Sequence, residues 1–210
     1  MPRATDASRE DFAAEARSLF ASLGLDASGG GTPGGGGRYD DLNKVFQHPT
    51  SGAGIYIGNH RAASSRETLG AHGIGHVVNC TDDLPLYFDG LAGRPGGMQY
   101  VPGDGRFHVA TWWRARSAGK METDAAVLEF FRPLFEWVDA ALERGSSVLV
   151  HCLAGAHRAG TTGVALMMYR GKLDAATATR TAQELRPVVN PMGSLGELLV
   201  LLDKALASSR

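Results

Sequence analysis

One stretch, residues 148–160, constrains the fold of this chain more than any other. Val148, Leu149 and Val150 are apolar and mostly β-branched, which is typical of a buried strand. A short loop containing Gly155 follows, and the apolar run over residues 163–169 indicates a buried helix. The stretch therefore predicts a strand, a tight loop and a helix in direct succession.

Cys152 and Arg158 enclose this loop. A short loop at a helix N-terminus can direct several backbone N–H groups at one point, which makes an anion site. The Arg158 guanidinium adds a planar, two-pronged donor suited to phosphate. A thiolate held there can attack phosphorus and form a phosphocysteine. The alternative is a structural cysteine with an unrelated His151 and Arg158 nearby, and the fixed offsets favour catalysis.

The pattern His151-Cys152-x-x-Gly155-x-x-Arg158 resembles the signature of the cysteine-based protein tyrosine phosphatases, the dual-specificity branch in particular. The resemblance extends over about residues 48–205 and includes residues 54–59, residues 69–79, Phe130-Phe131, Arg186-Pro187 and Asn190-Pro191. It implies that Cys152 is the nucleophile and that His151 supports the thiolate. The phosphate would be bound by Arg158 and the loop residues Leu153, Ala154, Gly155, Ala156 and His157.

The leaving oxygen of a phosphate ester needs a proton donor, and a carboxylic acid at the rim of the site can supply the proton. We favour Asp104, which follows a predicted strand in a way similar to the family's acid loop. It lies 48 residues before Cys152, farther than in the family, which suggests an insertion over residues 105–120. Glu122 and Asp124 are rivals, although Asp124 also suits the start of a helix. A plain Gly-Asp-Gly turn is the alternative for Asp104.

Two further residues bear on turnover and regulation. Ala159 stands where many relatives carry Ser or Thr, whose hydroxyl helps the thiolate leave, so we expect slow hydrolysis of the phosphoenzyme. Cys80 ends a predicted strand and resembles the second cysteine that some relatives pair with the nucleophile under oxidation. A buried strand cysteine is the alternative interpretation of Cys80.

Alternating strand and helix patterns predict an α/β fold, with a mostly parallel sheet of about four to five strands flanked by helices. We expect strands at residues 55–57, 76–80, 98–101 and 147–151, and an irregular loop over 103–121. We expect helices at residues 8–23, 64–69, 123–144, 159–170, 174–185 and 194–206. Residues 1–38 would form an N-terminal helix plus a Gly-rich linker, and residues 39–210 the catalytic domain.

The composition narrows the classes of partner and compartment. A net charge of −1 offers no basic field for nucleic acid or anionic lipid. No run approaches the roughly 20 apolar residues of a membrane span. Two cysteines suggest a reducing compartment, so we expect a cytoplasmic or nuclear protein. The sequence indicates no metal or cofactor site.

These observations predict a phosphatase whose substrates are phospho-Ser, phospho-Thr or phospho-Tyr in proteins. Two alternatives stay open: the same chemistry on phosphoglucan, lipid or RNA phosphates, or a phosphate-binding scaffold with little turnover. A partner could dock through the N-terminal helix or the loop at 105–120. Trp112 and Trp113 in that loop could line a substrate channel or close the core.

Overall fold

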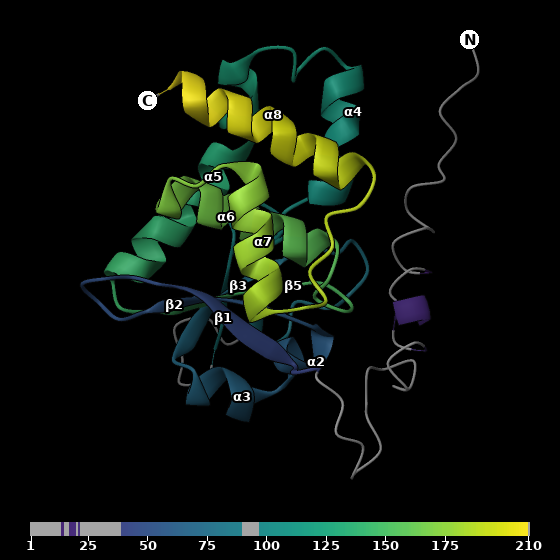
Figure 1. Ribbon diagram of the computed structural model, residues 1–210. Coiled ribbons are helices and arrows are strands. Elements are labelled where there is room, and N and C mark those ends of the chain that lie inside the picture. Colours follow the sequence, from purple (N-terminus) through teal and green to yellow (C-terminus); the bar gives the residue numbers. More distant parts are fainter. Residues whose placement is uncertain (1–13, 15–16, 20, 22–38, 90–96, 210) are drawn as a thin grey trace.

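The computed structural model describes residues 14, 17–19, 21, 39–89 and 97–209. A five-stranded sheet in the order β1-β2-β5-β3-β4 forms the centre of the described part (Figure 1). Its strands are β1 (Leu42–Gln47), β2 (Gly54–Gly58), β3 (Ile74–Asn79), β4 (Gln99–Tyr100) and β5 (Ser147–His151). β1 is antiparallel to β2, and the other neighbouring pairs are parallel. The predicted α/β class is therefore confirmed.

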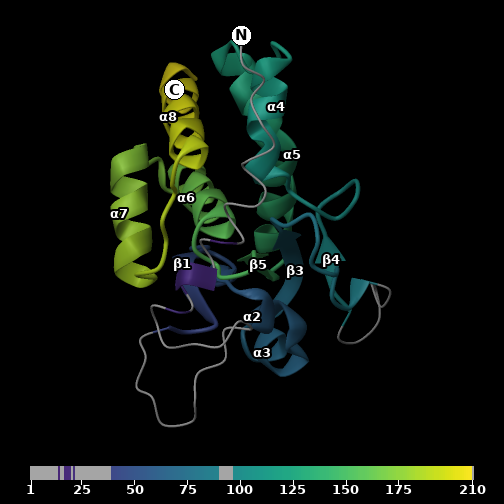
Figure 2. The ribbon, with the colours of Figure 1, turned by 90° about the vertical axis from the view of Figure 1, so that its right-hand side faces the viewer.

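Helices lie on both faces of the sheet (Figures 1 and 2). Below it in Figure 1 are α2 (His60–Ser64) and α3 (Arg66–Ala71). Above it are α4 (Trp112–Ser117), α5 (Asp124–Glu143), α6 (Arg158–Gly171), α7 (Ala175–Leu185) and α8 (Ser194–Ser208). A short 3-10 helix, η2 (Val109–Thr111), precedes α4.

Strand alternation explains how the two faces are buried. Ile55 and Ile57 of β2 pack in the large cluster that contains side chains of α5, α6 and α8. Tyr56, between them in sequence, packs instead in the smaller cluster with residues of α2 and α3. Successive side chains of a strand point to opposite faces, so β2 and β5 are buried along their whole length.

Most predicted elements are present, with differences of at most two residues at their ends. The predicted helix at 64–69 is instead two short helices, because Asn59 and Ser65 each accept hydrogen bonds from the first turn of a new helix. Asp174 caps α7, and α5 continues through Pro133 as one helix. β1 was not predicted. Neither were η2 and α4, which lie in the stretch expected to be irregular.

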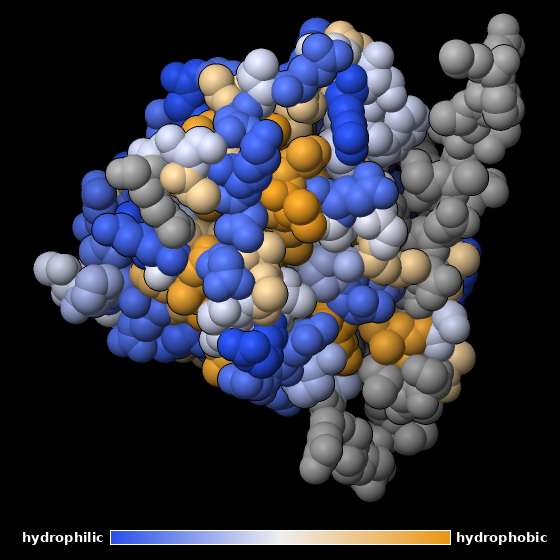
Figure 3. All heavy atoms as spheres, turned by 45° about the horizontal axis from the view of Figure 1, so that its top comes forward, coloured by the Kyte–Doolittle hydropathy of each residue, from blue (hydrophilic) through white to orange (hydrophobic). Residues whose placement is uncertain are grey.

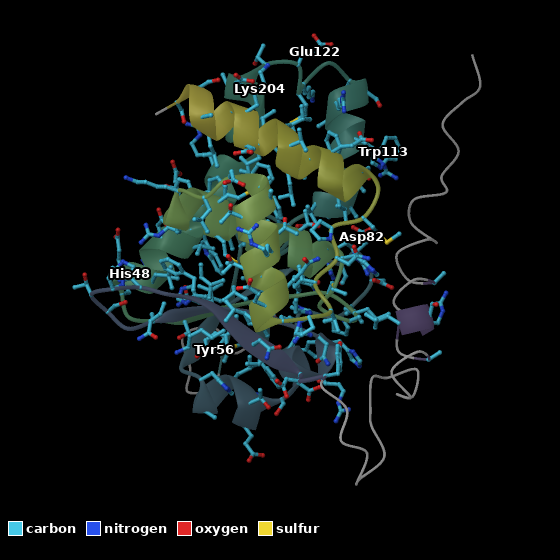
Figure 4. The ribbon with its side chains drawn as sticks, viewed as in Figure 1. His48, Tyr56, Asp82, Trp113, Glu122 and Lys204 are labelled. Carbon is cyan, nitrogen blue, oxygen red and sulfur yellow. The ribbon has the colours of Figure 1, made fainter. Side chains whose placement is uncertain are left out.

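The two tryptophans of α4 differ in burial. Trp112 is 1% exposed and belongs to the main core, with the Arg116 guanidinium 5.6 Å from its ring centroid. Trp113 is half-buried, and Arg114 lies 5.5 Å from its ring centroid (Figure 4). Of the two interpretations left open, Trp112 therefore closes the core.

Only a few residues of the N-terminal arm are described. Ala14, residues 17–19 and Ala21 are helical, and the rest of the helix predicted at 8–23 lies outside the described residues, as does the Gly-rich stretch 28–37. Leu19 packs against a small cluster formed by Ala154 and Ala156. Among the helices in the described part of the chain, none has the length and apolar character that a membrane crossing requires.

Candidate active site

The loop that contains Cys152 lies at the carboxyl edge of the parallel strands. β5 ends at His151, which pairs with Gly58 at the end of β2 and with Asn79 at the end of β3. α6 begins only seven residues later, at Arg158. This edge is where ligands bind in open α/β folds.

Every carbonyl group from residue 153 to residue 156 accepts a hydrogen bond from outside the loop. The Leu153 carbonyl accepts from the His60 amide at 3.2 Å, and the Ala156 carbonyl from the Asn190 amide at 3.1 Å. The two carbonyls between them are bonded by side chains: the Ala154 carbonyl by the Tyr39 hydroxyl and Arg186 Nη2, and the Gly155 carbonyl by Arg186 Nε. These contacts fix the orientation of four successive peptide planes.

The orientation of the carbonyls determines where the amides point. In a planar trans peptide the N–H is directed opposite to the C=O, and no cis peptide bonds occur in the described chain. The amides of residues 154–157 therefore face the inner side of the loop. The Gly155 amide shows this directly, because it donates to Cys152 Sγ at 3.2 Å. Backbone amides that converge in this way form a nest, a concave arrangement of the kind that suits an anion.

Cys152 and Arg158, at the two ends of this loop, are both buried. The exposed fractions are 3% for Cys152 and 9% for Arg158. Arg158 is the first residue of α6, so the helix N-terminus adds to the positive potential of the loop. Cys152 and Arg158 thus lie at the two ends of the loop that carries these amides.

Thr161 and Thr162 follow Ala159 closely in α6, and neither hydroxyl group donates a hydrogen bond to Cys152. Thr161 donates to the His157 carbonyl at 2.8 Å, and Thr162 donates to the Arg158 carbonyl at 2.9 Å. Both hydroxyl protons are therefore used inside α6. Neither threonine hydroxyl therefore donates to Cys152 Sγ.

Both histidines of the loop, His151 and His157, are buried. His151 is fully buried, and burial lowers its pKa to about 3 despite the nearby Cys152 backbone, so the ring is neutral at pH 7. Neither ring nitrogen makes a hydrogen bond of good geometry within the described chain. His157 is 6% exposed and therefore also lies in the interior.

Asp104 lies in the turn after β4, which leads back to the site edge. The Phe107 amide donates to the Asn79 carbonyl at 2.9 Å, beside the end of β5. Asp104 itself accepts from the Arg106 amide at 3.0 Å, and its Oδ2 lies 2.7 Å from His108 Nε2. Slight burial raises the pKa of Asp104, but the hydrogen bonds from His108 and Arg106 outweigh it and lower that pKa below its usual range.

The rival carboxylates lie elsewhere. Asp124 begins α5 and accepts a hydrogen bond from Ser208 at 2.8 Å, with Lys204 Nζ 3.5 Å away, so it contacts the end of α8. Glu122 lies at the top of the molecule, well away from Asp82, the aspartate on the other side of His108 (Figure 4). The structure thus places Asp104, and neither rival, in the turn that returns to the site edge.

The match with known proteins agrees with this geometry. The family model described as "Dual specificity phosphatase, catalytic domain" matches residues 55–204. The chain belongs to this family. Human dual specificity protein phosphatase 9 is 28% identical over 189 residues, which cover 88% of this chain and 43% of that protein. Dual specificity protein phosphatase 1 of Arabidopsis thaliana is 28% identical over 74% of this chain and 69% of its own.

Solved structures support the dual-specificity fold. Human DUSP28 aligns with a TM-score of 0.57 and 22% identity over 80% of this chain and 96% of that one. DUSP15 gives a TM-score of 0.57 and 23% identity over 80% of this chain and 90% of that one. Several curated relatives are much longer, since the match spans 43% of human phosphatase 9 and 22% of human Slingshot homolog 3.

Cys80 in this dual-specificity domain is a buried free thiol. Its Sγ lies 3.4 Å from Thr162 Oγ1, and it shares the main core with Cys152. Burial raises the pKa of Cys80 to about 12, so the thiol is neutral at pH 7. Both interpretations of Cys80, structural and redox, are consistent with this placement.

The described residues contain no group of three or more His, Cys, Asp or Glu side chains that could hold a metal ion. A hollow of about 490 Å³ between α5 and α8 is lined by residues that include Leu128, Phe135 and Leu206, and by none of residues 151–158. In Figure 3, hydrophobic side chains reach the surface in small areas between polar ones.

Sequence reasoning missed the residues that hold the loop from outside. Arg186 was noted only as part of a turn resembling the family, and Tyr39 only as the start of the domain. Arg186 is 1% exposed, and both residues bond to the Ala154 carbonyl. An arginine followed by proline at the end of a predicted helix was the only available signal, and it does not say which carbonyls the side chain reaches.

Proposed function

We propose that this domain hydrolyses phosphomonoesters through a phosphocysteine intermediate, and that its substrates are phospho-Ser, phospho-Thr or phospho-Tyr residues in proteins. The observation that carries the proposal is the set of inward-facing amides around Cys152, with Arg158 beside them. Such a nest suits the three non-bridging oxygens of a phosphoryl group, and the family membership supports the same chemistry.

The reaction proceeds in two steps. The loop amides and Arg158 bind the phosphate, and Cys152 Sγ attacks phosphorus while the bond to the leaving oxygen breaks. Asp104 protonates that oxygen. Asp104 then takes a proton from water, the water oxygen attacks phosphorus, and the thiolate leaves as inorganic phosphate forms.

A substrate panel tests the proposal. Wild-type protein should hydrolyse an aryl phosphate and phosphopeptides faster than phosphoglucan or phosphoinositides. Faster turnover of either non-protein substrate would contradict the substrate class. Phosphopeptide binding without any hydrolysis would favour the scaffold alternative and overturn the enzyme.

Slow release of the phosphoryl group from Cys152 is the expected kinetic signature. Ala159 offers no hydroxyl to the departing thiolate, and Thr161 and Thr162 use theirs inside α6. Stopped-flow with an aryl phosphate should show a burst approaching the enzyme concentration. Ala159→Ser should raise the steady-state rate about tenfold, because a hydrogen bond to a charged group is gained. A linear time course from the first turnover would contradict this expectation.

Asp104→Asn should lower kcat about 10²-fold on an alkyl phosphate, whose leaving oxygen needs a proton, and much less on an activated aryl phosphate. Glu122→Gln and Asp124→Asn are the matched controls and should leave both rates near wild type. If either control shows the selective loss instead, Asp104 is not the proton donor.

The pH profile should report the pairing of Asp104 with His108. A proton donor works only while protonated, so activity on an alkyl phosphate falls as pH rises through its pKa. His108 and Arg106 hold the pKa of Asp104 low, which moves this fall to acidic pH. His108→Gln removes a partner and leaves Asp82 nearby, so the fall should shift to higher pH. If the pH dependence of kcat/KM is the same in wild type and His108→Gln, then His108 does not determine the pH at which activity falls.

Cys80 is a candidate protector of the nucleophile. Peroxide would oxidise the Cys152 thiolate to a sulfenic acid, and attack by the Cys80 sulfur would form a disulfide and release water. Cys80→Ser should then recover less activity with thiol after peroxide treatment. Equal recovery of wild type and Cys80→Ser would leave Cys80 as a structural residue.

A further inference from the structure

A half-buried tyrosine from outside the family-matched segment bonds to the active-site loop. The family model begins at residue 55, whereas Tyr39, Asp40 and Asn43 precede it. The Tyr39 hydroxyl donates to the Ala154 carbonyl, and its pKa is raised to about 12 by burial, so the proton stays on the oxygen. The Tyr39 hydroxyl is therefore protonated and able to donate to the loop at neutral pH.

The Arg186 guanidinium uses all three of its nitrogens between the loop and the start of β1. Nε donates to the Gly155 carbonyl at 3.0 Å, and Nη2 donates to the Ala154 carbonyl at 3.2 Å. Nη1 donates to the Asp40 carbonyl at 2.9 Å and to Asn43 Oδ1 at 2.6 Å. The planar fork of arginine fits these acceptors, and a lysine ammonium cannot reach both sides at once.

The two side chains are themselves packed together. The guanidinium carbon lies 5.2 Å from the Tyr39 ring centroid. Asn59 Nδ2 lies 3.4 Å from the Tyr39 hydroxyl and also donates to Asp41 Oδ1 at 2.9 Å. Asn59 is in turn fixed as the cap of α2. These hydrogen bonds and ring contacts link α2, the start of β1 and the end of α7 to one another next to the active-site loop.

We infer that Tyr39 and Arg186 form a clamp that positions the loop amides for phosphate binding and for the Cys152 thiolate, and that neither touches the substrate. The clamp acts because it bonds the carbonyls of residues 154 and 155, whose peptide planes carry the amides of residues 155 and 156. Gly155 is the residue whose amide reaches Cys152 Sγ. The inference rests on the proposed function for its site, although anion binding alone can test it.

The experiment compares Tyr39→Phe and Arg186→Lys with matched controls. Tyr169→Phe removes a hydroxyl that bonds Asp139 at the far end of α6, and Arg180→Lys changes an exposed arginine on α7. For each folded protein we would measure tungstate affinity by calorimetry, the pH midpoint of Cys152 alkylation by iodoacetamide, and the thermal midpoint.

Arg186→Lys should weaken tungstate binding about tenfold and move the alkylation midpoint to higher pH, and Tyr39→Phe should do the same about threefold. Both controls should match wild type. Altered thermal stability with unchanged tungstate affinity and alkylation midpoint would overturn the clamp and leave a structural role. If Arg186→Lys does not fold, Tyr39→Phe decides the same question.

The clamp and the proposed function can fail separately. Wild-type protein that binds tungstate but hydrolyses no phosphomonoester would overturn the function, while the ranking of the variants would still support the clamp. Wild-type turnover with tungstate binding unaffected in both variants would overturn the clamp alone.

Discussion

Cys152→Ser should lower the turnover of an aryl phosphate by about 10⁴-fold or more, because a serine hydroxyl is a far weaker nucleophile than a thiolate. The substitution should reduce the rate of the chemical step without reducing anion binding or stability. The amides of residues 154–157 are oriented by bonds to the loop carbonyls, none of which involves the cysteine sulfur. Tungstate should therefore still bind, and the thermal midpoint should stay close to that of wild type.

Cys80→Ser is the matched control for this substitution. Both cysteines are 3% exposed, free and part of the same core cluster, so the exchange of sulfur for oxygen is comparable in packing terms. Under reducing conditions Cys80→Ser should keep the turnover of wild type. Residual turnover above about one per cent in Cys152→Ser would contradict a phosphocysteine mechanism, since a missing nucleophile removes the first step.

The elements around the loop could be predicted because their signals are local. β5 has the predicted bounds, residues 147–151, and α6 begins one residue before the predicted start. A run of apolar residues, a glycine-containing turn and a second apolar run define such a unit without reference to the rest of the chain. The family signature strengthened the same interpretation.

Other parts depend on contacts that no local pattern encodes. β1 reads Leu-Asn-Lys-Val-Phe-Gln, with polar residues at three of six positions, and it is a strand because it pairs with β2 at the sheet edge. α4 has only six residues, and its Trp112 packs in the main core. Arg186 reaches a carbonyl 31 residues earlier in the chain. Asp104 and His108 are only four residues apart, but they lie in a loop, where helical spacing rules do not predict a contact between them.

Gly155→Ala should lower the free energy of unfolding by about 3 kcal/mol or more and abolish phosphate binding. Gly155 has a φ of +68°, which side chains rarely adopt. A Cβ there would also lie 2.5 Å from the Gly58 carbonyl oxygen and 2.7 Å from Arg186 Nη2. Gly58 belongs to a buried strand and the guanidinium is bonded on both sides, so neither can move without displacing the loop.

Alanine substitutions at two other glycines distinguish the backbone strain at Gly155 from the steric contacts of an added Cβ. Gly145 has a φ of +78° but no heavy atom within 4 Å of an added Cβ, so Gly145→Ala should cost only the backbone strain, about 1–2 kcal/mol. Gly70 lies in α3 with the same open space, so Gly70→Ala should be neutral or stabilising by about 0.5–1 kcal/mol. Urea unfolding and tungstate titration would measure all three variants. If Gly155→Ala loses no more stability than Gly145→Ala, and still binds tungstate, then the contact of the loop with Gly58 and Arg186 is not what holds the amides in place.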